Sequence, residues 1–259
     1  MKPSTTQHIT SRDNPLVKKL RALAQDSTAY RRQGQVWLEG DHLLRALVTR
    51  GGRAAAVVGT ERGLAAADPT WLDGVEQVVC LPDPVMAGVS GLESPAALGA
   101  LWTLPAPESL EPDAPTVVLD RLQDAGNVGA ILRSAAAFGF RQVLALRGTA
   151  ALWSPKVVRA GMGAHFGLHL IEGLEVDDLA ALRVPLLVTS SHRGDWLHRR
   201  TWPWPCAWVM GHEGQGVGEA LTARADAFVR IVQPGGEESL NVAAAAAICL
   251  HASAAQQAA

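Results

Sequence analysis

Short apolar blocks alternate with helix-favouring stretches through the first hundred residues. The blocks have the length and β-branched content of buried strands, and the stretches between them carry apolar residues at helical spacing. We predict strands at 36–39, 54–59, 75–81 and 97–102, and helices at 41–50, 61–67 and 84–89. This alternation indicates a small α/β domain over residues 35–103.

The same alternation returns after residue 115 and continues to the C-terminus. We predict strands at 116–119, 142–146, 168–171, 185–189, 207–210 and 228–232. Alanine is the strongest helix former, so the alanine-rich stretch from Glu238 to Ala255 predicts a closing helix. Residues 116–259 are therefore predicted to form a second α/β domain.

Two segments lie outside this alternation. In residues 1–34, Leu16, Leu20 and Leu23 recur at helical spacing with basic residues between them, which predicts a basic helical arm. Residues 104–115 hold four prolines and several acids, which is typical of a stiff, solvated linker. We place the boundary between the two domains in this linker.

Composition excludes several classes of protein and leaves an asymmetry of charge. With 259 residues, 48% of them hydrophobic and 19% charged, the chain is neither disordered, nor collagen-like, nor a small disulfide scaffold. The formal charge of −2 divides into +5 for residues 1–34 and −7 for the remainder. Because nucleic-acid binders are usually basic, the total alone argues against RNA, whereas the basic arm argues for it. We expect RNA affinity to depend on this arm.

Nothing in the sequence predicts a metal site, a disulfide or a membrane span. The three cysteines, Cys80, Cys206 and Cys249, are widely spaced and have no metal-ligand pattern. The polar N-terminus lacks the apolar stretch of a signal peptide. The most apolar window, 242–250, is much shorter than the roughly 20 residues that cross a bilayer. We predict a soluble cytoplasmic protein without a metal.

Three segments that follow predicted strands carry candidate chemistry, since α/β sheets bind ligands at the carboxyl ends of their strands. The first follows strand 116–119, where Asn127, Gly129 and Arg133 are spaced so that Gly129 and Arg133 share one helix face. Gly129 leaves that face open, and Arg133 can reach an anion across it. The alternative is an ordinary helix start with Asn127 as its cap and Arg133 as a solvated charge.

The second segment, Gly211-His212-Glu213-Gly214-Gln215-Gly216, follows strand 207–210. Its three glycines allow the backbone to approach a ligand closely, and Glu213 is its fixed charge. The spacing differs from the dinucleotide fingerprint, and a tight turn explains it equally well.

The third segment runs from strand 228–232 through Gln233-Pro234-Gly235-Gly236 to Ser239, Leu240 and Asn241. Ser239 and Asn241 stand at the mouth of the closing helix, where backbone N–H groups are unpaired. The alternative is a plain helix cap made by Glu238 or Ser239.

Taken together and in this order, the three segments resemble the three motifs of the SpoU/TrmH family of RNA ribose 2′-O-methyltransferases, within the SPOUT superfamily. ITSRDNPLVKKLRAL, RRQGQVWLEGDHLLRAL and GLESPAALGALW resemble the family's N-terminal substrate-binding domain, which is L30e-like. The resemblance spans nearly the whole chain. It implies a parallel α/β sheet with a C-terminal deep trefoil knot, preceded by the small L30e-like domain.

The resemblance also implies a cofactor, a homodimer and roles for individual residues. S-adenosylmethionine would be bound in the knot by Gly211, Ile231 and Leu240. The family's catalytic polar set falls on Asn127, Arg133, Glu213, Ser239 and Asn241. The substrate would be RNA, held by the N-terminal domain, with candidate phosphate contacts at Lys18, Lys19, Arg31 and Arg32.

The chain departs from the family pattern in the third motif. The family often has Ile-Pro there, whereas this chain has Ile231-Val232, with Pro234 two places later. Glu237 and Glu238 add negative charge to the same loop, where they could repel RNA phosphate or cap the helix.

The mechanism that the resemblance implies is an in-line methyl transfer to a ribose 2′-oxygen. The family assigns the general base to the arginine that corresponds to Arg133. Because a guanidinium is normally always charged, we expect Arg133 instead to stabilise negative charge that develops on the 2′-oxygen. Asn127 and Ser239 would position Arg133 and the ribose, and Asn241 would order the loop.

Ribosomal RNA is the predicted substrate, because the separate N-terminal domain resembles that of members acting on ribosomal RNA. A transfer-RNA methyltransferase and a non-catalytic RNA-binding protein are the alternatives. A nucleotide-dependent oxidoreductase is disfavoured, because the glycine fingerprint and its following acid are missing from the sequence.

Overall fold

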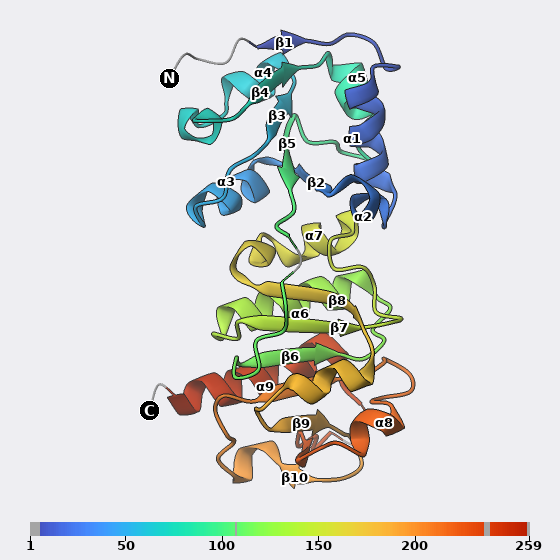
Figure 1. Cartoon of the computed structure of the whole chain (residues 1–259), viewed down its shortest axis with the longest axis vertical. Helices are drawn as coiled ribbons and strands as arrows, with labels where there is room; N and C mark the ends of the chain where they lie inside the picture. Colours follow the sequence, from blue (N-terminus) through green and yellow to red (C-terminus); the bar gives the residue numbers. More distant parts are fainter. Residues whose placement is uncertain (1–5, 107, 236–238, 258–259) are drawn as a thin grey trace. The chain divides into compact units, whose positions relative to one another are not determined.

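The computed structural model describes residues 6–106, 108–235 and 239–257. The chain divides into two compact units, and each is described by itself. Unit 1 consists of Met1–Ala106 with Trp153–Phe166, and unit 2 of Pro107–Leu152 with Gly167–Ala259. Figure 1 follows the chain through both units.

Unit 1 is built on a five-stranded mixed sheet in the order β1-β4-β3-β5-β2. Its strands are β1 Gln7–His8, β2 Gln35–Glu39, β3 Ala56–Gly59, β4 Gln77–Cys80 and β5 Leu98–Thr103. Strand β5 runs antiparallel to both β2 and β3, whereas β1, β3 and β4 pair in parallel. The four predicted strands are confirmed to within a few residues. The two-residue β1 carries too short a pattern to be predicted.

Short helices surround this sheet. They are α1 Pro15–Gln25, α2 Ala29–Gln33, α3 Asp41–Thr49, α4 Glu61–Ala65, η1 Pro69–Leu72, α5 Asp83–Ala87, α7 Pro155–Gly161 and η2 Ala164–Gly167. Helix α1 begins where Asn14 accepts a hydrogen bond from the Leu16 backbone amide, at 2.9 Å. Val17, Leu20 and Leu23 of α1 are buried in unit 1. Deleting residues 1–34 would therefore remove core side chains together with the basic charges.

A segment from the back half of the chain, Trp153–Phe166, groups with unit 1. The Trp102 ring lies 5.4 Å from the Trp153 ring and 5.3 Å from the Phe166 ring, measured between centroids. Gly163 has a φ of +87°, and a Cβ there would lie 2.4 Å from the Ala46 side chain. This close approach needs glycine. No feature of the sequence pattern predicted that this segment packs with the front half.

Unit 2 is built on a seven-stranded sheet in the order β10-β12-β9-β11-β6-β7-β8. Its strands are β6 Thr116–Leu119, β7 Gln142–Leu146, β8 His169–Leu174, β9 Leu186–Thr189, β10 Asp195–Trp196, β11 Ala207–Met210 and β12 Ala227–Arg230. Every pairing in this sheet is parallel. Because strands buried on both faces read as continuous apolar runs, the sequence predicted all of them except the short β10.

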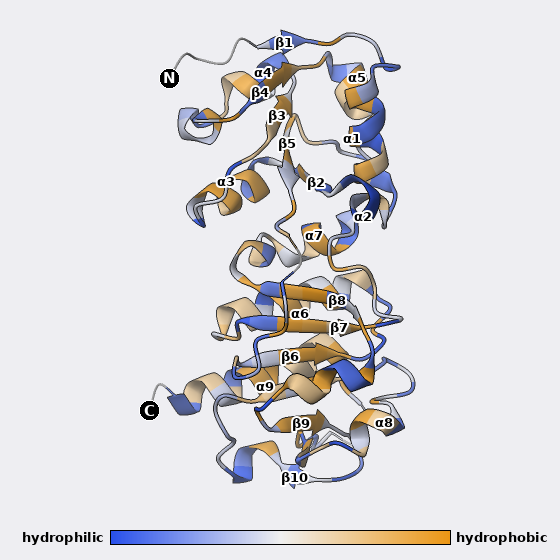
Figure 2. Ribbon diagram, viewed as in Figure 1, coloured by the Kyte–Doolittle hydropathy of each residue, from blue (hydrophilic) through white to orange (hydrophobic). Residues whose placement is uncertain are grey.

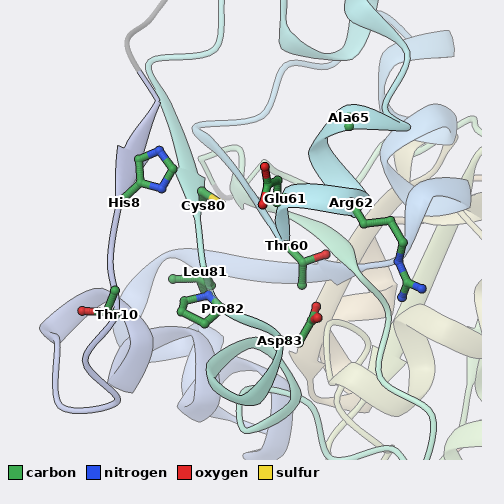
Figure 3. A pocket seen from close by; sticks show the side chains of 10 residues that line it. All are labelled: His8, Thr10, Thr60, Glu61, Arg62, Ala65, Cys80, Leu81, Pro82 and Asp83. Carbon is green, nitrogen blue, oxygen red and sulfur yellow. The ribbon is translucent and has the colours of Figure 1, made fainter.

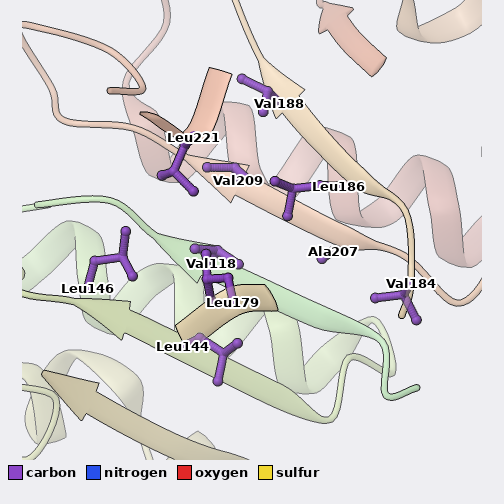
Figure 4. Packing of buried hydrophobic residues seen from close by; sticks show 10 residues of the cluster. All are labelled: Val118, Leu144, Leu146, Leu179, Val184, Leu186, Val188, Ala207, Val209 and Leu221. Carbon is purple, nitrogen blue, oxygen red and sulfur yellow. The ribbon is translucent and has the colours of Figure 1, made fainter. Parts of the chain in front are cut away.

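In the core of unit 2, buried apolar side chains of neighbouring strands pack against one another. In Figure 2 strands β6 and β7 are largely coloured as hydrophobic. Figure 4 shows the cluster that one face of the sheet contributes to, made of Val118, Leu144, Leu146, Leu179, Val184, Leu186, Val188, Ala207, Val209 and Leu221. The helices of this unit are α6 Ala125–Ala137, η3 Val176–Ala181, η4 Leu197–Arg199, α8 Glu219–Thr222 and α9 Val242–Gln257.

One predicted helix start is wrong, and one alternative for another helix start is excluded. The closing helix begins at Val242 and not at Glu238, which lies outside the described residues. Asn241 sets the start, because its side-chain oxygen accepts hydrogen bonds from the amides of Ala243 and Ala244 at 2.9 and 3.2 Å. The alternative in which Asn127 caps helix α6 does not hold, because Asp124 is the cap and its carboxylate accepts a hydrogen bond from the Asn127 backbone amide at 2.7 Å.

No helix in the described ranges has the length and hydropathy of a membrane span. Within those same ranges, no group of three or more His, Cys, Asp or Glu is arranged to hold a metal ion.

The indole of Trp208 in β11 is fully buried and donates to the Ser253 hydroxyl of α9 at 2.9 Å. Replacing Ser253 with alanine would leave a buried donor unpaired. We predict that Ser253→Ala lowers the free energy of unfolding by about 1–3 kcal/mol, as measured by urea denaturation. In a Trp208→Phe background, which has no indole donor, the same change should cost less than about 1 kcal/mol. Equal costs in the two backgrounds would show that the hydrogen bond is not what Ser253 contributes.

Candidate functional site

A cavity of about 710 Å³ opens in unit 2 where parallel strands β9, β11 and β12 end. Its lining comes from residues within 188–193, 211–217, 228–233 and 239–245, and from Thr222. This is the edge at which parallel α/β sheets bind ligands, and the volume is typical of a small-molecule site. The second and third predicted motifs therefore meet in one cavity.

Gly211 marks the point where the chain leaves β11 and turns back on itself. A Cβ at Gly211 would lie 2.3 Å from the backbone nitrogen of Val217 and 2.4 Å from the carbonyl carbon of Gly216. Backbone groups cannot yield in the way that the end of a flexible side chain can. Only glycine fits here, and its absence of a side chain holds the 211–217 loop closed beside the cavity.

A chain of side-chain hydrogen bonds joins all three motifs. The Asn127 amide donates to Glu213 Oε1 at 3.3 Å, and the Asn241 amide donates to Asn127 Oδ1 at 3.0 Å. Asn241 in turn caps α9, so the chain links the loop after β11, the first turn of α6 and the first turn of α9. Asn127 uses both of its side-chain polar atoms in this network and is a cross-link between the other two motifs.

Glu213 is held as a carboxylate by donors that converge on it. Partial burial alone would raise the pKa of Glu213, but hydrogen bonds outweigh this effect and lower the pKa below the usual value for glutamate. The donors are its own backbone amide, the Asn127 side chain and the amides of Asp124 and Gln123. The stabilisation is fully present above the ordinary glutamate pKa, and it is lost as pH falls through the lowered one.

The predicted cofactor residues Gly211, Ile231 and Leu240 all line the cavity, as do Glu213, Ser239 and Asn241. One further lining residue, Gln233, has a buried side-chain oxygen that no described residue pairs with. An unpaired buried acceptor implies a ligand or water that donates to it. Apolar lining residues such as Ile231 and Leu240, together with the unpaired acceptor of Gln233, fit S-adenosylmethionine, whose adenine carries an amino donor.

Two predicted catalytic residues, Asn127 and Arg133, are not among the residues that line this cavity. Asn127 is joined to it by its hydrogen bonds with Glu213 and Asn241, whereas Arg133 is not. Arg133 lies on the exposed face of α6, more than a turn beyond Asn127. None of the residues that the structure describes forms a hydrogen bond or ion pair with its guanidinium. Arg133 is thus an exposed cation of unit 2 without a partner among the described residues.

Sequence reasoning missed two sets of residues at this site. The first is the loop after β9, residues 190–194, in which the Arg193 guanidinium stacks on the Phe228 ring at 3.8 Å. The loop is polar and has no recognisable motif. It could have been found only by noting that it, too, follows a buried strand.

The second missed set is an ion pair beside the 211–217 loop, between the buried Asp120 and the partly exposed Arg121. Asp120 is 3% exposed and binds the Arg121 guanidinium at 2.8 and 3.1 Å and the Gly218 amide at 2.7 Å. The hydrogen bond with Asp120 raises the pKa of Arg121. Arg121 also donates to Gln215 at 3.2 Å and has a φ of +57°, unusual for a residue with a side chain. The signal was a charged pair at the end of a strand.

The four predicted RNA contacts lie in unit 1, on α1 and α2, and have partners within the protein. Lys18 forms an ion pair with Asp13 at 3.0 Å, and Arg32 one with Asp26 at 3.2 Å. Lys19 donates to Gln35, and Arg31 donates to the Tyr30 hydroxyl at 3.2 Å. Exposed ion pairs of this kind are weak, so these cations can still exchange their partners for phosphate.

Comparison with known proteins agrees with this geometry. The model of the SpoU rRNA Methylase family matches residues 114–251. The chain is 30% identical over 218 residues to the 23S rRNA (guanosine(2553)-2′-O)-methyltransferase RlmP of Bacillus subtilis, covering 83% of this chain and 86% of that protein.

Solved structures give the same result. An AdoMet-bound rRNA methyltransferase from Sinorhizobium meliloti is similar with a TM-score of 0.82 and 25% identity, over 97% of this chain and 98% of the other. A structure of an RNA 2′-O ribose methyltransferase is similar with a TM-score of 0.80 and 28% identity, over 98% and 100% of the two chains.

Gly211 and Gly214 give a matched pair of substitutions in one loop. A Cβ at Gly211 would collide with backbone, whereas a Cβ at Gly214 would make an ordinary contact with His212 at 3.8 Å. We predict that Gly211→Ala weakens S-adenosylmethionine binding by more than about tenfold in calorimetry, and that Gly214→Ala binds almost as well as the unchanged chain. Equal affinities for the two variants would mean that the Gly211 turn does not shape the binding site.

Proposed function

The chain belongs to the SpoU rRNA methylase family, and on that premise we propose that it transfers the methyl group of S-adenosylmethionine to a ribose 2′-hydroxyl of ribosomal RNA. The observation that carries this proposal is the cavity in unit 2, at which the glycine loop, Glu213 and the Ser239–Asn241 segment meet. The relatives are RNA methyltransferases that act on ribosomal RNA, which supports both the reaction and the class of RNA. We place the enzyme in the cytoplasm with its substrate.

The proposed cofactor site uses the chain's own groups in three ways. Gly211 lets the backbone approach the cofactor, Ile231 and Leu240 supply apolar contacts, and Gln233 supplies its unpaired acceptor. When bound, S-adenosylmethionine supplies a methyl group that is already activated by a sulfonium. No metal is needed for that chemistry.

The acceptor side of the reaction is the harder one, because a ribose hydroxyl is a weak acid. Catalysis therefore requires that the hydroxyl be oriented and that its developing negative charge be stabilised. We assign the charge stabilisation to Arg133, whose guanidinium is permanently charged. It forms no hydrogen bond or ion pair with the described residues, so it can bind the substrate without breaking one. Glu213, Asn127 and Asn241 hold the loops around the cavity, and Ser239 at its rim orients the ribose.

We further propose that the enzyme works as a homodimer and that Arg133 serves the cavity of the partner subunit. Within one chain Arg133 is exposed and does not line the cavity. Arg133 lies on α6, which packs against α9. Helix α9 begins beside the cavity, because Asn241 and Val242 line it. A second copy docked on these two helices would bring one chain's Arg133 to the other chain's cavity.

Two finer features of the fold belong to the same proposal. We propose a deep trefoil knot at the C-terminus, supported by the strand order, in which β11 is inserted between β6 and the earlier strand β9. We also propose that unit 1 is an L30e-like RNA-binding domain, which the mixed sheet of five strands and the basic helices α1 and α2 support.

The reaction is tested with purified protein, methyl-labelled S-adenosylmethionine and RNA from a strain that lacks the gene. We expect label in ribosomal RNA, at a nucleotide whose 3′ linkage becomes resistant to alkali, because a methylated 2′-oxygen cannot attack the phosphate. Asn127→Ala should lower kcat/KM by about 10–100-fold, since it breaks the cross-link between Glu213 and Asn241.

Asn14→Ala is the control for this substitution, because Asn14 caps α1 in unit 1 and has no contact with the cavity. Label confined to transfer RNA would contradict the ribosomal substrate and support the alternative. A protein that binds RNA but transfers no label to either RNA would contradict the enzymatic assignment.

Action of Arg133 on the partner's cavity has a separate test. Assayed at a limiting concentration of S-adenosylmethionine, Arg133→Ala and Gly211→Ala should each be nearly inactive as purified dimers, because one lacks the guanidinium and the other binds the cofactor poorly. After the two are mixed and subunits exchange, random pairing should restore about a quarter of the unchanged activity, because each mixed dimer has one complete site. A mixture as inactive as its components would show that Arg133 acts within its own subunit or that no dimer forms.

A further inference from the structure

Unit 1 contains a second cavity that the proposed methyl transfer does not use. Its volume is about 640 Å³, and it lies where the parallel strands β1, β4 and β3 end. The three strands end at the same edge of the sheet, because their last residues, His8, Cys80 and Gly59, are paired in register. This sheet edge is thus a place where three chain segments diverge and leave a hollow.

The cavity is lined by polar and apolar groups from all three segments. They are His8, Thr10, Thr60, Glu61, Arg62, Ala65, Cys80, Leu81, Pro82 and Asp83. Throughout the described part of the chain, no residue forms a hydrogen bond or ion pair with the side chains of Glu61, Arg62 or Asp83. The charged groups around this hollow are therefore available to a ligand.

One donor and one acceptor stand next to each other in the cavity. Thr60 is 4% exposed, and its oxygen accepts a hydrogen bond from the Gly63 amide at 3.1 Å. The Thr60 hydroxyl donates to no acceptor among the described residues, so this lining residue has a donor available to a ligand. Figure 3 shows the Asp83 carboxylate beside Thr60, whereas Glu61 points away from Asp83.

From this pairing we propose that the cavity binds an unpaired guanine of the RNA substrate. The Watson–Crick edge of guanine presents an acceptor, O6, followed by two adjacent donors, N1–H and N2–H. The Thr60 hydroxyl can donate to O6, and the two oxygens of the Asp83 carboxylate can accept from N1–H and N2–H. The two side chains together complement that edge. Adenine and cytosine place a ring acceptor where the carboxylate needs a donor, and uracil offers only one donor.

The remaining lining residues suit the rest of a nucleotide. Pro82 and Ala65 provide apolar surface for the base, while Arg62 extends along one side of the cavity and can meet a phosphate. The carboxylates repel phosphate, so the nucleotide enters base first. RNA sequence is usually recognised at unpaired bases of this kind. The inference rests on the proposed function only in taking RNA as the substrate.

The test compares the labelled RNA pentamers UUGUU and UUAUU in fluorescence anisotropy with the full chain. We expect UUGUU to bind about tenfold more tightly, the discrimination typical of a two-bond contact to a base edge. Asp83→Asn should abolish that preference, because an amide presents a donor to one of the guanine donors. Asp83 is exposed, so this change is not expected to affect folding.

Asp73→Asn is the matched control, since Asp73 is an exposed acid of unit 1 outside the cavity and the change in charge is the same. It should retain the preference for UUGUU. Equal binding of the two pentamers by the unchanged chain would overturn the guanine assignment. A preference that survives in Asp83→Asn would overturn this cavity as the site.

Failure of this inference can be told apart from failure of the proposed function. Methylation of ribosomal RNA without any preference between the pentamers overturns the guanine site alone. A guanine preference that depends on Asp83, in a chain that methylates no RNA, supports the guanine site and contradicts the proposed reaction.

Discussion

The constraint on which unit 2 depends is the insertion of β11 between β6 and β9. Paired in parallel on both sides, β11 is the strand from which the glycine loop emerges, and its neighbours fix where that loop begins. Its buried Trp208 also ties α9 to the sheet through Ser253. The positions of the closing helix and of the cavity loop thus both depend on β11. If β11 paired wrongly, both would be misplaced.

The site is organised by shared hydrogen bonds more than by charge. Asn127 donates to Glu213 and accepts from Asn241, and each of those residues is bonded in turn to backbone amides at the start of a helix. Such an arrangement orders the loops without burying a net charge, which would be expensive. The one buried carboxylate nearby, Asp120, is matched by Arg121 and by a backbone amide.

The sequence predicted the features that depend on neighbouring residues in the chain, and it missed those that depend on contacts made only in the folded protein. The bounds of β6, β7 and β11 follow from apolar runs. Glu213, Asn127 and Asn241 meet because each lies in a segment that follows a strand of one parallel sheet. The start of α9 was wrong, because a single asparagine side chain decided it. Arg193 and Arg121 were missed, since stacking on Phe228 and a left-handed backbone are properties of the folded chain.

The grouping of Trp153–Phe166 with unit 1 makes the two units interlocked in sequence. The polypeptide passes from one unit to the other three times, after residues 106, 152 and 166. A protease that cut the proline-rich stretch would leave the units joined through the two later passages. A fragment starting at residue 107 would carry Val157 and Val158 without the surface that buries them. The catalytic half is therefore not a detachable module, and exchanging front halves between relatives would require exchanging this segment as well.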